Sequence, residues 1–204
     1  KQAIMQRIRQ AERERVFDEF KDRSGEIVSG IVRRFDRSDV ILEISRGEGI
    51  MPAKERVPTE EYQVGERLRM LILKVENRAH GPDIVLSRSH PDFVRRLFEM
   101  EVSEIADGTV EIKGIAREAG FRTKISVLSH DEKVDPIGAC VGMRGIRVKN
   151  IVRELSGEKI DIVRWRDDIR SYVTEALAPA KLIRLDIDEE LRKVDVLVDS
   201  DQLS

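Results

Sequence analysis

The chain has 204 residues, of which 40% are hydrophobic, 37% charged and only 4% aromatic, and its formal net charge is −2. No apolar run approaches the length of a membrane span, and the single cysteine, Cys140, excludes a disulfide framework and is typical of a reducing cytoplasm. The three histidines lie far apart, and no Gly-x-x-x-x-Gly-Lys motif, nucleophile elbow or His/Cys cluster is present, so we expect neither an enzyme nor a bound cofactor or metal.

Residues 1–23 predict one amphipathic helix. Its outer face alternates arginine with glutamate, a pattern that more often marks a solvated surface than a nucleic-acid contact. The chain begins with Lys1 rather than methionine, and its last residues carry no terminating signal, so we expect a piece of a longer protein in which this is a connecting helix. The apolar stripe is formed by Ala3, Ile4, Ile8, Ala11 and Val16.

Residues 24–90 predict a small β-barrel. Several short alternating segments within about 70 residues, separated by turns, are typical of this fold, and the expected strands cover 25–34, 39–45, 68–76 and 83–87. The segment resembles the S1-like RNA-binding domain, an OB-fold. The resemblance rests on Gly-Glu-Ile-Val-Ser-Gly-Ile-Val from Gly25, Gly49-Ile50-Met51-Pro52, and Ile84-Val-Leu-Ser-Arg88.

The usual base-stacking side chains of S1-like domains are missing from this barrel. The positions that carry two aromatic residues and a histidine in that family hold Ser38, Ile41 and Pro52 here, and Phe35 falls where an aliphatic core residue is usual. Because stacking contributes about 1–3 kcal/mol per base, we expect a minor RNA contribution from this barrel. A barrel that is mainly a spacer or a protein-docking module is the alternative. The candidate contacts are Arg33, Arg37, Lys54 and Arg56.

Residues 91–166 predict a helical region, two strands, two further helices and a last strand. The first helical region runs from Pro91 to Gly108, the two strands cover 109–116 and 121–129, and the last strand covers 158–165. Between them Asp135 followed by Pro136 predicts an N-cap and the start of a short helix. This αββααβ order is that of a type II KH domain, which holds a short single strand of nucleic acid.

The centre of that segment is a glycine loop between two helices. Gly142-Met143-Arg144-Gly145 precedes a basic helix, and residues 136–153 contain four basic residues and no acidic one. Two glycines allow close approach of another backbone, and helix N-termini attract phosphate. An ordinary helix corner is the alternative. We expect RNA contacts from Gly142, Met143, Arg144, Gly145, Arg147, Lys149 and Arg153.

Residues 167–204 repeat the beginning of the same pattern. Asp167-Asp168 predicts the cap of a helix that ends near Leu177, and strands are expected at 181–188 and 191–199. This αββ order matches the opening half of a second KH domain, without its glycine loop. The predicted fold class is therefore α+β and multidomain.

The whole chain resembles the NusA family of bacterial transcription termination/antitermination factors. The resemblance rests on the domain order and on several runs, of which Val-Asp-Pro-Ile-Gly-Ala-Cys-Val-Gly-Met-Arg-Gly at 134–145 is the most specific. The others are Val-Glu-Ile (110–112), Ile-Ala-Arg-Glu-Ala-Gly (115–120), Gly-Glu-Lys-Ile-Asp-Ile-Val (157–163) and Ala-Leu-Ala-Pro-Ala (176–180).

The resemblance implies a cytoplasmic, monomeric regulator that holds single-stranded nascent RNA and acts in pausing, termination and antitermination. RNA polymerase would be bound mainly by regions outside this chain, residues 1–23 being the last helix of the polymerase-binding domain, and other Nus factors are implied as partners. No membrane partner is expected. Two alternatives remain: an RNA-binding appendage of a polyribonucleotide phosphorylase, in which the KH domain precedes the barrel, and a ribosomal protein, which would not carry an S1-like barrel upstream.

Overall fold

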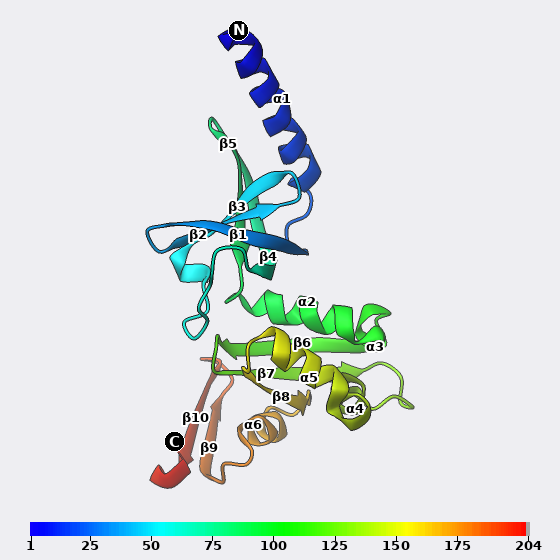
Figure 1. Ribbon diagram of the computed structural model, residues 1–204. Coiled ribbons are helices and arrows are strands. Elements are labelled where there is room, and N and C mark those ends of the chain that lie inside the picture. Colours follow the sequence, from blue (N-terminus) through cyan, green and yellow to red (C-terminus); the bar gives the residue numbers. More distant parts are fainter. Residues whose placement is uncertain (203–204) are drawn as a thin grey trace.

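The computed structural model describes residues 1–202 as an elongated molecule (Figure 1). Helix α1, a barrel, an α/β unit and a C-terminal hairpin follow one another along its length. The helices are α1 (Gln2–Phe20), α2 (Pro91–Glu101), α3 (Ser103–Ala106), α4 (Pro136–Val141), α5 (Ile146–Glu154) and α6 (Ile169–Leu177). The strands are β1 (Ile27–Asp36), β2 (Asp39–Ile44), β3 (Gly47–Met51), β4 (Arg67–Arg78), β5 (Gly81–Ser87), β6 (Val110–Glu118), β7 (Arg122–Ser129), β8 (Lys159–Arg164), β9 (Leu182–Asp188) and β10 (Lys193–Val198).

The first five strands close into a barrel in the order β1-β2-β3-β5-β4. Neighbouring strands are antiparallel except β3 and β5, which pair in parallel. Alternate side chains such as Val32, Val40 and Leu42 are fully buried inside it. Glycine is needed at position 30, because a Cβ there would lie 2.8 Å from Cγ2 of Ile44. The expected S1-like barrel is confirmed.

Strand β3 is one that the alternation pattern does not predict. Two of its five residues are glycines, which are depleted in strands. A Cβ on Gly47 would lie 2.7 Å from Cγ1 of Val16, and one on Gly49 would lie 2.6 Å from Cδ1 of Leu86. The glycines therefore allow α1 and β5 to pack closely against this strand, and the same residues give the sequence the appearance of a turn.

Helix α1 is attached to the barrel by its C-terminal half. Phe20 is only 1% exposed and belongs to the barrel core, and Val16 packs against that core. Closer to the N-terminus of α1, a guanidinium nitrogen of Arg13 donates to the carbonyl oxygen of Ala79 at 3.4 Å. Ile4 and Ile8, in the N-terminal half, are exposed. The predicted apolar stripe therefore exists, but only its C-terminal end is covered by residues of the described chain.

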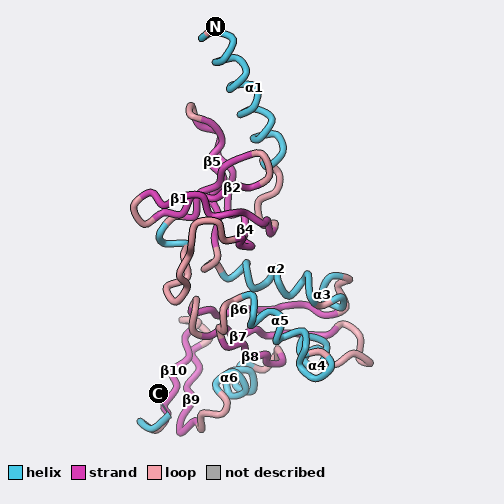
Figure 2. The backbone as a smooth tube through the Cα atoms, viewed as in Figure 1, coloured by secondary structure: helices cyan, strands magenta, loops and turns pink. Residues whose placement is uncertain are grey.

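The α/β unit has a three-stranded sheet in the order β6-β7-β8. Strands β6 and β7 are antiparallel, whereas β7 and β8 are parallel. Helices α2, α4 and α5 pack on this sheet, and α2 also contacts β4, so it lies between the sheet and the barrel (Figure 2). Phe93, Phe98, Ile125 and Ile151 form the centre of the core. The predicted αββααβ order is confirmed.

Two buried arginines join the barrel to this unit. Arg88, which is 3% exposed, donates to Glu60 at 2.7 and 2.8 Å, to the carbonyl oxygen of Arg69 at 2.7 Å, and to the carbonyl oxygen of Glu154, at the end of α5, at 2.8 Å. All these acceptors lie on the barrel or on α5. Charge-assisted bonds of this kind are stronger than neutral ones and fix geometry.

The second arginine, Arg117, pairs with Glu158 at 3.0 Å, and the two side chains are 1% and 0% exposed. Arg117 also donates to the carbonyl oxygens of Arg88 and His90, at 2.7 and 3.0 Å. Glu158 in turn accepts from the backbone N–H of Gly120 at 2.6 Å and from the hydroxyl of Thr123 at 2.6 Å. The two pairs therefore lock the barrel and the sheet into one arrangement.

The last elements form the expected αββ. Asp168 caps α6 by accepting from the backbone N–H of Ser171 at 2.9 Å, and the bonds from Ser171 lower the pKa of this carboxyl. Strands β9 and β10 pair as an antiparallel hairpin, and Arg170 on α6 donates to the carbonyl oxygen of Leu185 on β9 at 3.2 Å. Among residues 1–202, no helix combines the length and apolarity that crossing a membrane requires.

Candidate nucleic-acid interface

The loop between α4 and α5 has a backbone that ordinary residues rarely adopt. Gly142 has φ 75° and ψ 172°, Arg144 has φ 54°, and Gly145 has φ 73°. At Gly142 a Cβ would lie 2.7 Å from Cγ of Arg147, so glycine is required there both for its backbone and for space. The N–H of Gly145 donates to the carbonyl of Gly142 at 3.0 Å, which closes the loop.

This tight loop points its two central side chains outward. Met143 is 83% exposed and Arg144 is also exposed. Arg144 makes no side-chain hydrogen bond or ion pair with any other described residue. A non-glycine residue with positive φ is uncommon, and such strain is concentrated at functional sites. The loop is therefore a rigid turn with an available guanidinium group.

The N-terminus of α5 follows this loop without a side-chain cap. Its N-cap is Gly145, and its first turn contains no acidic residue. The first N–H groups of a helix have no intrahelical partner, and together with the helix dipole they favour an anion. The N-terminus of the short helix α4, in contrast, has a side-chain cap: Asp135 accepts from the N–H of Ile137 at 3.1 Å.

The three basic residues predicted on α5 have different surroundings. Arg147 is half-buried and donates to Oε2 of Glu104 and to the carbonyl oxygen of Ala139, both at 2.7 Å. Lys149 donates to the carbonyl oxygen of Arg144 at 3.2 Å and so supports the loop. Arg153 is exposed and has no side-chain partner within residues 1–202. Arg147 therefore has a structural task, whereas Arg153 is available for an external anion.

The four basic residues predicted on the barrel also differ. Arg33 pairs with Glu43 through a bond of 2.6 Å, and Arg56 donates to the carbonyl of Ser38 at 2.9 Å. Arg56 also lies 5.2 Å from the ring centroid of Tyr62, whose pKa is raised by burial to about 12. Arg37 and Lys54 are exposed and make no side-chain bond to another described residue. Of the four predicted residues, these two have their charge available.

The expectation that Phe35 belongs to the core is wrong. Its side chain is 40% exposed. Strand β1 has a bulge between Val32 and Arg34, after which Phe35 pairs with Val40 near the hairpin end. The bulge shifts the alternation of β1, so Phe35 shares the core side with the buried Val40. The ring is nevertheless 40% exposed, because it lies beside the hairpin turn at the end of the barrel.

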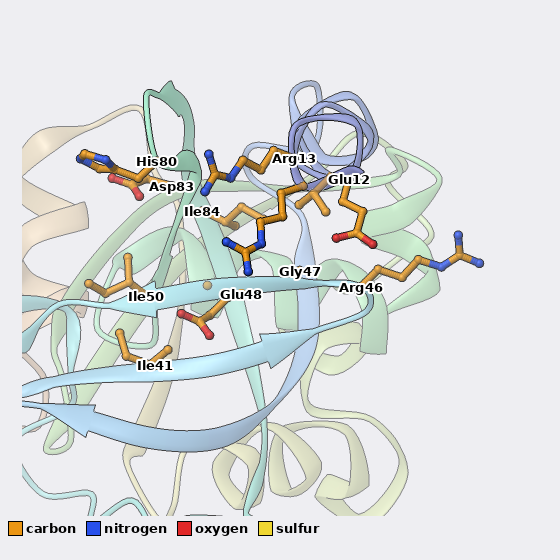
Figure 3. Close-up of a pocket in the computed structure, with 13 residues that line it drawn as sticks. Glu12, Arg13, Ile41, Arg46, Gly47, Glu48, Ile50, His80, Asp83 and Ile84 are labelled. Carbon is orange, nitrogen blue, oxygen red and sulfur yellow. The ribbon is translucent and has the colours of Figure 1, made fainter. Parts of the chain in front are cut away.

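A cavity of about 410 Å³ lies elsewhere, between α1 and the barrel (Figure 3). Ile41 and Ile50 line its barrel side, and its charged lining includes both signs: arginines 9, 13 and 46, glutamates 12 and 48, and Asp83. Balanced charge of this kind favours no particular ion. Within residues 1–202 no group of three or more His, Cys, Asp or Glu side chains could hold a metal ion.

The single cysteine lies two residues before the loop and is buried. Burial raises the pKa of the Cys140 thiol to about 12. Since the thiolate is the reactive form, Cys140 in the native protein should not react at pH 8 with an aromatic disulfide reagent that releases a coloured thiolate. The protein unfolded in urea should release about one equivalent of this coloured thiolate. Rapid reaction of the Cys140 thiol in the native protein would contradict the burial of this side chain.

The junction residues are Arg88, Glu60, Arg117 and Glu158, and all but Glu60 lie in runs on which the family resemblances rest. Charged residues are common in a chain of this composition, and nothing local marks these four as buried. Their pairing depends on segments that are distant in the sequence but meet in the folded protein. Their burial therefore becomes evident only from the tertiary structure.

The sequence of the chain is similar to that of known proteins. A family model described as "NusA-like first KH domain" matches residues 88–165. Over its full length the chain is 48% identical to transcription termination/antitermination protein NusA of Halalkalibacterium halodurans, 47% to that of Bacillus subtilis and 42% to that of Thermus thermophilus. It covers 53%, 55% and 53% of these proteins, about half of their length. The chain belongs to the NusA family of transcription termination/antitermination proteins.

Proposed function

We propose that this chain binds the backbone of single-stranded RNA at the loop Gly142–Gly145 and the N-terminus of α5. The observation that carries the proposal is the loop itself, in which three positive φ angles place the exposed Arg144 beside the N-terminus of α5, a helix without a side-chain cap. Backbone amides bind phosphate without reading the base. Arg153 and Lys149 would extend the contact along α5, and Arg147 would act mainly by holding α4 and α3 together.

The barrel is proposed as a weaker contact of the same strand. Among the predicted residues, Arg37 and Lys54 have available charge, while Arg33 and Arg56 are engaged with Glu43 and Ser38. We propose the domain division as residues 1–23, 24–90, 91–166 and 167–204: a connecting helix, an S1-like domain, a first KH domain and part of a second.

In a complete protein of this family, we propose that this RNA contact serves transcription termination and antitermination in the bacterial cytoplasm. The relatives, which are transcription termination/antitermination proteins, support this role. RNA polymerase and other Nus factors are the proposed partners, the polymerase being bound mainly by regions beyond this chain. The matches extend over all 204 residues, which favours this role over the phosphorylase appendage and the ribosomal protein.

The proposal is tested by titrating the protein into a fluorescently labelled single-stranded RNA of about 12 nucleotides and measuring the binding constant at several salt concentrations. We expect binding to weaken with salt with a logarithmic slope of about −2 to −3, since each phosphate contact on a single strand contributes about −0.7. A duplex of the same length should bind more weakly. Equal binding of the duplex, or no binding at low salt, would contradict the proposal.

The same mixtures, incubated with Mg²⁺ and inorganic phosphate and then run on a denaturing gel, should contain intact RNA. Shortened RNA that follows the protein through purification would revive the phosphorylase alternative.

A further inference from the structure

The hairpin that joins β1 and β2 presents an aromatic ring at the end of the barrel. Phe35 and Phe121 are the only aromatic side chains among the exposed large hydrophobic residues of the described chain. Phe35 pairs across the hairpin with Val40, which is fully buried, so its ring lies on the same side of the sheet as the barrel core. One part of the ring is therefore covered by protein and the other part is open.

The hairpin is held in place by a second segment. Arg56 donates to the carbonyl of Ser38 at 2.9 Å, and Asp39 accepts from the backbone N–H of Ala53 at 2.9 Å. These two bonds fasten the turn of the hairpin to the short helix Ala53–Glu55. A ring supported in this way loses little conformational freedom when a ligand covers it.

Two exposed cations lie on the hairpin and on the segment bonded to it. Arg37, at the turn, has φ 55°, an uncommon conformation for arginine, and its side chain is exposed. Lys54 is exposed on the fastened segment. Asp36 is the exposed carboxylate nearest in sequence, while Asp39 is engaged with Ala53. An open aromatic face, with two unpaired cations on the same hairpin and its bonded segment, is a combination that can bind a base and its phosphates.

We propose that Phe35 is a base-stacking residue of the barrel, with Arg37 and Lys54 contacting the adjoining phosphates. This rests on the proposed binding of single-stranded RNA and gives the barrel's part in it a specific place. The stack lies outside the positions 38, 41 and 52 where S1-like domains usually carry their stacking side chains. Because every base has a flat face, the contact holds RNA with little preference for sequence.

The first experiment compares variants of the two exposed phenylalanines in the full chain. Phe35→Ala should lower the affinity for the single strand of about 12 nucleotides by about fivefold to tenfold, the lower part of the range for one stacked base. Phe121→Ala, at the turn between β6 and β7, is the matched control and should change affinity by less than about twofold. Thermal melts should show that both variants are folded.

Two more variants separate stacking from packing. Phe35→Leu keeps an apolar side chain over Val40 but removes the aromatic face, so it should bind as weakly as Phe35→Ala. Phe35→Tyr should restore the original affinity. If Phe35→Leu binds normally, the ring contributes only to barrel packing and the proposal is wrong.

A direct signal comes from Phe35→Trp in a Trp165→Phe background, which leaves one tryptophan in the chain. RNA should quench its fluorescence, as expected when a base stacks on the indole. No quenching at saturating RNA, with the glycine-loop variant described below still losing affinity, would overturn the stacking contact and leave the proposed function intact. If neither the loop variant nor Phe35→Ala changes affinity, the proposed function itself fails.

Discussion

Replacing Met143 and Arg144 together by aspartate is expected to lower the affinity for single-stranded RNA on the order of 100-fold. The two carboxylates would stand where the phosphates are held, and like charges at an interface cost several kcal/mol. The loss of Arg144 should also reduce the salt slope by about 0.7. Both side chains are exposed, and aspartate tolerates the left-handed conformation that Arg144 adopts, so the thermal melt should be almost unchanged.

Two control variants sharpen this result. Met143→Asn with Arg144→Asn has nearly the same shape without the charge, so it should lose less affinity and isolate the repulsion. Arg37→Asp with Lys54→Asp also introduces two carboxylates, one of them at a residue with positive φ, but places them on the barrel and makes the charge one unit more negative than the loop variant does. If the barrel is the weaker contact, this second pair loses no more than about tenfold. Unchanged binding by a folded loop variant would mean that the loop is an ordinary helix corner.

Arg117→Met is expected to lower the free energy of unfolding by about 3–5 kcal/mol. Methionine leaves Glu158 as a buried carboxylate without its cationic partner, with only the bonds from Gly120 and Thr123 remaining. The substitution also removes the hydrogen bonds that Arg117 donates to the carbonyl oxygens of Arg88 and His90. Urea unfolding followed by circular dichroism measures the change.

The control for this stability change is an ion pair on the surface of the same sheet. Arg122 and Asp161 are paired but partly exposed, so Arg122→Met should cost less than about 1 kcal/mol. The double variant Arg117→Met with Glu158→Gln should recover part of the loss, because no full charge is then left buried without a partner. Equal costs for Arg117→Met and Arg122→Met would show that the buried pair adds nothing specific.

The sequence predicts those parts of the molecule that are determined by neighbouring residues. Asp135-Pro136 marks the start of α4, and alternation marks β1, β2, β4 and β5. The glycine loop is visible because backbone angles of this kind require glycine at fixed spacing. Local rules are sufficient where the cause is local.

The parts that could not be predicted depend on contacts between distant residues. Strand β3 contains glycines because α1 and β5 press against it, and only their positions reveal that. The bulge after Val32 changes which face Phe35 occupies. Likewise, Arg147 resembles its basic neighbours in the sequence, but Glu104, 43 residues away, decides that it is held by the protein.

The two buried arginine pairs, Arg88 with Glu60 and Arg117 with Glu158, make the molecule rigid along its length. Phe20 anchors α1 in the barrel, and Arg88 fastens the barrel to the far end of the helix whose near end forms the loop. Bending at this joint would break several buried ionic bonds at once. The distance from α1 to Gly142 is therefore fixed, and a partner bound to α1 would determine how far away the proposed RNA-binding loop is held.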